Sequence, residues 1–209
     1  MKKKLSLKYG FKEIGQEDIQ NGTKRVSYLI YKINENKLFH NLSFELGEGC
    51  ALLIKGKNGS GKSTLLRIIL GITVPTKGNI YTAASIQICY LGHKNALKSY
   101  LTMRDNIDLM QLKNHKELNY YLDLLSLKKH LDVTVSSLSF GQQKKLALLR
   151  VFLNTSKLLI LDEPFVGLDD ASHEQLTSFL SNELIMGKGL IFTSHITCEI
   201  KAESLVLIN

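Results

Sequence analysis

The chain has 209 residues, of which 44% are hydrophobic, 22% are charged and only two are proline. This length suits one α/β domain with a substantial core, and the composition excludes wholesale disorder and fibrous repeats. Its 27 Lys and Arg against 19 Asp and Glu give a formal net charge of +8, which favours a polyanionic ligand, a nucleic acid or an anionic lipid surface without choosing among them.

The first 25 residues carry seven Lys and Arg against three acidic residues and show little hydrophobic periodicity. We therefore expect residues 1–25 to be a mobile basic extension, followed by a single domain over residues 26–209. The extension lacks the apolar core of a secretory signal, and its early acidic residues argue against a mitochondrial transit peptide. No apolar run approaches the roughly 18 residues of a membrane span.

The cysteines indicate a reducing compartment. Cys50, Cys89 and Cys198 are odd in number and widely separated. This spacing predicts neither a disulfide framework nor a zinc site.

From residue 26 onward, short apolar stretches alternate with helical patterns. The expected strands fall at residues 38–46, 51–54, 86–91, 158–161, 190–193 and 205–208. Helical patterns fall at residues 64–70, 118–125, 143–153 and 176–184. This alternation predicts an α/β fold with a mostly parallel sheet. Asp169, Asp170 or Ser172 could cap the last of these helices.

A glycine-rich loop separates the expected strand at 51–54 from the helix at 64–70. Residues 56–63 read GKNGSGKS and satisfy the pattern GxxxxGK[ST], in which backbone N–H groups and the following helix N-terminus bind phosphate. Lys62 is expected to reach the β- and γ-phosphates, and Ser63 to offer its hydroxyl to Mg²⁺. The nucleotide-contacting residues predicted here are Gly56, Lys57, Asn58, Gly59, Ser60, Gly61, Lys62, Ser63 and Thr64.

Two carboxylates follow the apolar stretch at 158–161. Asp162 and Glu163 are succeeded by Pro164, as expected where a buried strand delivers acidic side chains to its carboxyl end. Asp162 is predicted to hold Mg²⁺, directly or through water, and Glu163 to accept a proton from the attacking water. Taken alone, these residues could also form a surface turn.

A third motif narrows the family. Residues 138–142 read LSFGQ and lead into the helical pattern at 143–153. With the phosphate loop and the acidic strand, this makes the chain resemble the ATP-binding cassette (ABC) family over residues 28–209. The resemblance implies an ABC-type ATPase with a P-loop NTPase fold, in which a mostly parallel sheet carries a small antiparallel β subdomain and a helical subdomain.

The resemblance also implies that two copies of the chain act together. In this family, the segment containing Ser139, Gly141 and Gln142 contacts the γ-phosphate of a nucleotide held by a second subunit, so that ATP is sandwiched in a head-to-tail dimer. Lys62, Glu163 and His195 would be catalytic, with His195 contacting the γ-phosphate. A serine-capped helix start would explain Ser139 but not the following Gly-Gln pair.

Two further site residues come from the resemblance. Tyr31 is the nearest aromatic to the adenine-stacking position, with Tyr28 as the alternative, although direct alignment places Ile33 there. His93 occupies the place of the glutamine that usually reaches Mg²⁺ and couples to the membrane partner; the alternative is an ordinary surface histidine.

The segment YLGH at residues 90–93, together with features near residues 97–106 and 162–165, resembles the ABC subunits of cytochrome c biogenesis. That resemblance implies a multi-span membrane permease and haem-handling maturation proteins as partners. The chain would lie on the cytoplasmic face of a bacterial inner membrane or the matrix face of a mitochondrial one. Two alternatives are another ABC exporter, or a soluble ABC ATPase of DNA repair or iron–sulfur assembly. A nucleic-acid partner is not expected.

Overall fold

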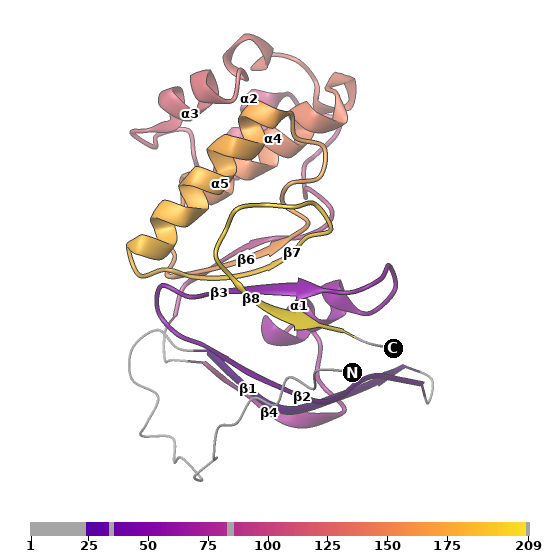
Figure 1. Cartoon of the computed structure of the whole chain (residues 1–209). Helices are drawn as coiled ribbons and strands as arrows, with labels where there is room; N and C mark the ends of the chain where they lie inside the picture. Colours follow the sequence, from indigo (N-terminus) through magenta and orange to yellow (C-terminus); the bar gives the residue numbers. More distant parts are fainter. Residues whose placement is uncertain (1–23, 34–35, 83–85, 208–209) are drawn as a thin grey trace.

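The computed structural model describes residues 24–33, 36–82 and 86–207, which form two sheets and a helical layer (Figure 1). The central sheet has the order β5 (Ile88–Leu91), β6 (Leu158–Asp162), β7 (Gly189–Thr193), β3 (Ala51–Lys55) and β8 (Glu203–Val206). All neighbouring pairs are parallel, so the five carboxyl ends lie along one edge. The predicted α/β fold with a mostly parallel sheet is confirmed.

Both faces of this sheet are covered, which is why its strands are apolar almost throughout. Leu159 and Leu161 belong to the core that the sheet shares with the helical layer, whereas Leu158 and Ile160 belong to the core on the opposite face. The first core includes residues of α4 (Phe140–Phe152) and α5 (Asp170–Ile185), and the second includes those of α1 (Lys62–Ile69). α1 and α4 therefore lie on opposite sides of the sheet (Figure 1).

A smaller antiparallel sheet completes the fold below α1 in Figure 1, as predicted for the β subdomain. Its order is β2 (Asn36–Leu46), β1 (Lys24–Ile33) and β4 (Lys77–Thr82). The strand expected at 38–46 is β2, which therefore belongs to this sheet and not to the parallel one. β1 begins two residues before the expected start of the domain, and residues 1–23 of the expected extension lie outside the described residues.

The helical layer contains α2 (Met103–Leu109), α3 (Leu118–Leu124), α4, α5, and the 3₁₀ turns η2 (Lys128–His130) and η3 (Val135–Ser137). α3 is the helix predicted at 118–125. Its Tyr121 ring stacks on Phe152 with centroids 4.9 Å apart.

Asp169 caps α5, because its Oδ1 accepts the Ser172 N–H at 3.0 Å. Within the described ranges, no helix has both the length and the apolar character of a membrane span.

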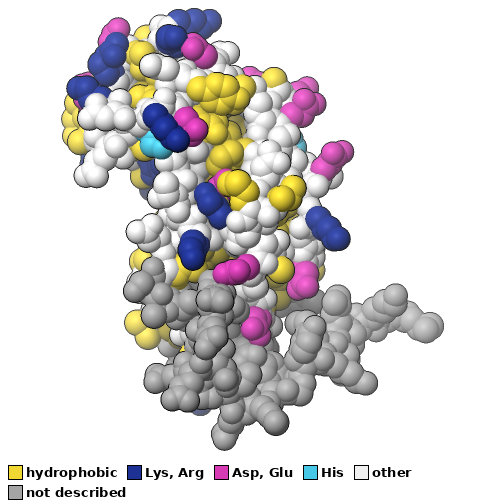
Figure 2. Space-filling model, turned by 90° about the vertical axis from the view of Figure 1, so that its left-hand side faces the viewer, with side chains coloured by type: hydrophobic (Ala, Val, Ile, Leu, Met, Phe, Trp, Pro, Cys, Tyr) yellow, Lys and Arg dark blue, Asp and Glu magenta, His cyan; other side chains and the backbone are white. Residues whose placement is uncertain are grey.

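Charged side chains of both signs lie over the helical layer. Figure 2 shows Lys and Arg side chains on one face of this layer with Asp and Glu side chains among them. This part of the chain also has three exposed ion pairs: Arg104 with Asp132, Lys113 with Asp108, and Lys128 with Asp123. Exposed pairs of this kind contribute little stability, but they reduce the positive field that a polyanion would meet.

Candidate active site

The phosphate loop lies at the carboxyl edge of the central sheet, between β3 and α1. Gly59 and Gly61 have φ of 81° and 92°, a left-handed conformation that side chains disfavour. At Gly56, an added Cβ would overlap the buried Ser60 side chain. The glycines predicted from the motif are therefore required by the backbone path of the loop.

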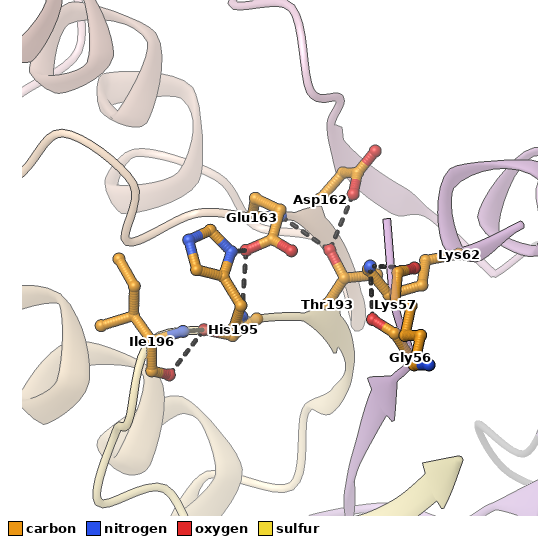
Figure 3. Close-up of polar contacts among 9 residues, drawn as sticks. Gly56, Lys57, Lys62, Asp162, Glu163, Thr193, His195 and Ile196 are labelled. Carbon is orange, nitrogen blue, oxygen red and sulfur yellow. Dashed lines mark hydrogen bonds and ion pairs between the residues drawn. The ribbon is translucent and has the colours of Figure 1, made fainter. Parts of the chain in front are cut away.

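Lys62 is the first residue of α1, and its side chain turns back over the loop (Figure 3). Its Nζ donates to the carbonyl oxygens of Gly56 at 2.9 Å and Lys57 at 3.2 Å. The ammonium therefore lies beside the loop and near the positive end of the α1 dipole, where an anion is favoured.

Asp162 ends β6 at the same edge and is 1% exposed. Its Oδ1 accepts a hydrogen bond from Thr193 Oγ1 at 2.7 Å. Its Oδ2 is buried and has no hydrogen-bond partner among the described residues. A buried carboxylate oxygen without a donor is costly unless a cation balances it.

This unpaired oxygen fits a Mg²⁺ ligand. Mg²⁺ is usually bound by one or two carboxylates together with water and substrate phosphates, and the exposed Ser63 hydroxyl lies in the first turn of α1. The described residues contain no group of three or more His, Cys, Asp or Glu side chains able to hold a metal. Phosphate oxygens would have to complete the coordination.

Glu163 follows Asp162 with φ of 49°, a strained conformation for a residue with a side chain. Its N–H donates to Thr193 Oγ1 at 2.8 Å, and its Oε2 accepts the His195 N–H at 3.2 Å. The same Oε2 lies 2.9 Å from His195 Nδ1 (Figure 3). The Glu163 side chain is 10% exposed and the His195 side chain 65%, so the imidazole partly covers the carboxylate.

Thr193 joins the two acidic residues, and sequence reasoning gave it no role. Its buried hydroxyl donates to Asp162 Oδ1 and accepts from the Glu163 N–H. Asp162 and Thr193 are paired in register between β6 and β7. The sequence does show a polar residue, Thr193, at the end of an apolar strand shortly before His195. Its partners could not be predicted, because they depend on β7 lying beside β6.

Lys144 is a second residue that the motifs did not assign. It lies on α4, is 2% exposed and has no hydrogen bond or ion pair within the described part of the chain. Burial lowers its pKa to about 8, against the opposing effect of Asp162 and Glu163, whose charges favour the protonated form. The ammonium therefore partly balances the two carboxylates from the helical side.

The LSFGQ segment has local structural roles beyond those expected. Ser139 caps α4 by accepting the Gln142 N–H at 3.2 Å, and Gln142 Oε1 accepts the Ser139 N–H at 2.9 Å, which completes a capping box. Gly141 is also constrained, because an added Cβ would lie 2.6 Å from Gly167 O. The helix start therefore explains Gln142 as well as Ser139, whereas Gly141 is constrained by the neighbouring Gly167 carbonyl.

The two remaining predicted site residues lie apart from this network. Tyr31 pairs with Phe39 between β1 and β2, and its side chain is outside the described residues. His93 is exposed and follows β5 at the carboxyl edge, next to the strand that carries Asp162. In the described residues, no hydrogen bond joins His93 to the phosphate loop or to Asp162.

A phosphate loop, an Asp-Glu pair and an LSFGQ helix start on one parallel sheet define the ATP-binding subunits of ABC transporters. The family model described as ABC transporter matches residues 39–166, and the chain belongs to this family as an ABC-type ATPase.

Similar named proteins indicate a particular group within the ABC family. The cytochrome c biogenesis ATP-binding export protein CcmA of Haemophilus ducreyi is 34% identical over 83% of this chain and 90% of its own length. The CcmA protein of Pseudomonas putida is 37% identical over 78% of this chain and 85% of its own length.

Solved structures support the fold. A putative ABC transporter ATP-binding protein from Pyrococcus furiosus matches with a TM-score of 0.75 at 19% identity, covering 88% of this chain and 97% of that one. An ATP-binding cassette captured as a dimer in a post-hydrolysis state with ADP and phosphate matches with a TM-score of 0.70 at 24% identity, covering 83% and 88%.

Proposed function

We propose that the chain is the ATP-hydrolysing subunit of an ABC transporter complex in cytochrome c maturation, acting in haem export or in release of a haem-loaded chaperone. The CcmA relatives support this role, since they match more than three quarters of the chain. The subunit would lie peripherally on the cytoplasmic face of a bacterial inner membrane, against a CcmB-like multi-span permease and haem-handling maturation proteins. The relatives named above are bacterial, which favours that face over the mitochondrial matrix.

One observation carries the ATPase part of the proposal: Lys62, Asp162 and the Glu163–His195 pair converge at the carboxyl edge of one sheet. The loop at residues 56–63 would bind the β- and γ-phosphates through its N–H groups. Lys62 would exchange its carbonyl partners for phosphate oxygens, and Thr64 would complete the binding segment. Tyr31 is proposed to stack on the adenine.

The hydrolytic step falls to residues that are already held in place. Ser63 and Asp162 would hold Mg²⁺, which supplies charge neutralisation between the β- and γ-phosphates when bound. Glu163 would accept the proton of the attacking water. His195, which is hydrogen-bonded to Glu163 Oε2 and largely exposed, would contact the γ-phosphate.

A second copy of the chain would complete each site. Ser139, Gly141 and Gln142 begin a helix on the face of the sheet opposite α1, so they are poised to meet the nucleotide of another subunit and not their own. ATP would then be sandwiched in a head-to-tail homodimer. His93, at the same edge, is proposed to couple this dimer to the membrane partner.

The decisive test of the ATPase mechanism is Glu163→Gln. We expect hydrolysis to fall by about 100-fold or more, because the proton acceptor is lost, while ATP binding and ATP-driven dimerisation persist. Phosphate release measures hydrolysis, and light scattering measures ATP-driven dimerisation. Glu174→Gln, an exposed change on α5, is the matched control. Wild-type turnover in Glu163→Gln would contradict the assignment.

The transport part is tested by its partners. Affinity purification of the tagged protein from native membranes in gentle detergent, with mass spectrometry and a haem absorption scan, should recover a multi-span permease with haem-handling proteins. Recovery of a different permease would leave the proposed ATPase activity intact but would contradict the proposed role in haem export. Recovery of soluble partners or nucleic acid alone would favour the DNA-repair or iron–sulfur alternatives.

A further inference from the structure

Gln142 makes one contact that its capping box does not explain. Its Nε2 lies 3.0 Å from Nε2 of His130, the last residue of η2. The contact is half-buried and joins η2 to the third residue of α4, across twelve positions in sequence. His130 itself is anchored by its backbone, since its N–H donates to Leu127 O at 2.9 Å.

The direction of this hydrogen bond follows from the capping box. The Ser139 N–H can only donate, so the atom facing it at 2.9 Å is the carbonyl oxygen of Gln142. The amide NH₂ must then face His130, where it can only donate. His130 Nε2 is therefore the acceptor, and a neutral His130 carries its proton on Nδ1.

Protonation of His130 would turn this contact into an opposition of two donors. Turning the Gln142 amide by half a rotation would satisfy the imidazolium, but it would place NH₂ against the Ser139 N–H and open the capping box. Within the described residues, no carboxylate pairs with His130. The charged side chains on η2, α2, α3 and α4 and directly after η2 are Lys128, Lys129, Arg104, Asp105, Asp108, Asp123, Lys144, Lys145, Arg150 and Asp132. Among these, Lys128, Arg104 and Lys145 have carboxylate partners, and Asp108 pairs with Lys113.

We propose that neutral His130 is a positioning residue for the LSFGQ segment at residues 138–142, here called the signature segment: it fixes the Gln142 amide so that Ser139 and Gln142 present one arrangement to the nucleotide of a second subunit. This inference rests on the proposed head-to-tail dimer. Assembly of the ATP-bound dimer should then weaken when residue 130 no longer offers an acceptor to the Gln142 amide.

The first test is independent of dimerisation. Long-range ¹H–¹⁵N NMR of the ¹⁵N-histidine-labelled full chain, with His130 assigned by comparison with His130→Gln, reports which ring nitrogen carries the proton. We expect the Nδ1–H form at about pH 8, and loss of that form in Gln142→Ala. An Nε2–H form or a fast-exchanging mixture in the wild type would overturn the inference.

The second test measures ATP-driven dimerisation in the Glu163→Gln background, where hydrolysis does not remove the dimer. Dimer affinity should fall about five- to tenfold in His130→Lys, which offers only donors to the Gln142 amide; this is the range expected from loss of one cap interaction. His130→Gln offers an amide acceptor and should keep the affinity of the parent protein.

His115→Gln is the matched control, because His115 also accepts a backbone N–H through a ring nitrogen, that of Glu117, outside the signature segment. It should leave dimer affinity unchanged. Parent-like affinity in His130→Lys, or equally weak affinity in His130→Gln and His130→Lys, would overturn the role of His130. Absence of any ATP-driven dimer in the parent would instead contradict the proposed function, and the NMR result would still decide the tautomer.

Discussion

The carboxyl edge of the central sheet is held together by residues far apart in the chain, whereas the signature segment at the start of α4 is held chiefly by its own neighbours. Thr193 reaches across from β7 to both Asp162 and Glu163, which are 31 and 30 positions away. Ser139 and Gln142 cap one another across three positions. The first arrangement exists only when β6 and β7 pair in register, and the second requires only that α4 form.

This difference matches what each region is proposed to do. A hydrolytic site needs a carboxylate held in a fixed position, and preorganised groups supply much of the rate. The signature segment completes its task only with a second subunit, so a locally stabilised helix start on the surface suffices. Two lysines of α4 connect the regions: Lys144 is buried toward Asp162 and Glu163, and Lys145 donates to Asp169 at 2.7 Å.

The largest effect on stability is expected from Thr193→Val, which keeps the side-chain shape and leaves Asp162 Oδ1 and the Glu163 N–H unpaired. The free energy of unfolding should fall by about 1–3 kcal/mol, and hydrolysis by about tenfold or more, because Glu163 loses its anchor. Urea denaturation and phosphate release measure these. Thr177→Val removes a buried hydroxyl with no partner among the described residues and should not lower stability, because no hydrogen bond is lost. Equal effects would contradict the bridging role.

Lys144→Met tests the interaction of buried Lys144, on α4, with Asp162 and Glu163. The pKa of Lys144 is lowered from 10.5 to about 8, so between these values the unfolded chain binds more protons and stability rises with pH. The substitution should flatten that rise and increase the free energy of unfolding at pH 7 by about 1–2 kcal/mol. Denaturant titrations from about pH 7 to pH 10 provide the measurement, with exposed Lys157→Met as the control. A steeper rise in Lys144→Met would disprove the assignment.

Ser139→Ala acts on the local region alone. Loss of the Oγ acceptor should reduce stability by about 1 kcal/mol and increase hydrogen exchange at the Gln142 amide, while the Asp162–Glu163 network keeps its protection. Exchange measured by mass spectrometry with peptide resolution separates the two regions. Ser137→Ala, two residues earlier and exposed, should leave both unchanged. Loss of protection at β6 in Ser139→Ala would show that the regions are not independent.

The smallest effect concerns Asp169, whose pKa is lowered to about 2 by hydrogen bonds from Lys145 and Ser172. This contribution to stability is present above the ordinary carboxyl pKa and is lost as pH falls toward about 2. Because the side chain is 60% exposed, Asp169→Asn should remove only roughly 0.2–0.5 kcal/mol. Unfolding curves from about pH 5 to pH 2 check this. An acid transition unchanged by Asp169→Asn would exclude the contribution.

The sequence alone determined the parts whose residues are contiguous. The GKNGSGKS loop between a strand and a helix, and the apolar β6 ending in Asp162 and Glu163, follow from local pattern and backbone conformation. The parallel sheet followed from alternating strands and helices. By contrast, β1 and β4 were not identified as strands, and β2 proved to belong to the antiparallel sheet.

Only the tertiary structure decided how distant residues meet. Thr193 contacts the acidic pair because β7 lies beside β6, an order that no local pattern specifies. The same holds for the burial of Lys144 and for the contact of His130 with Gln142. Local sequence fixes the conformation of a short segment through its own hydrogen bonds and sterics, whereas such pairings depend on which surfaces the whole core brings together.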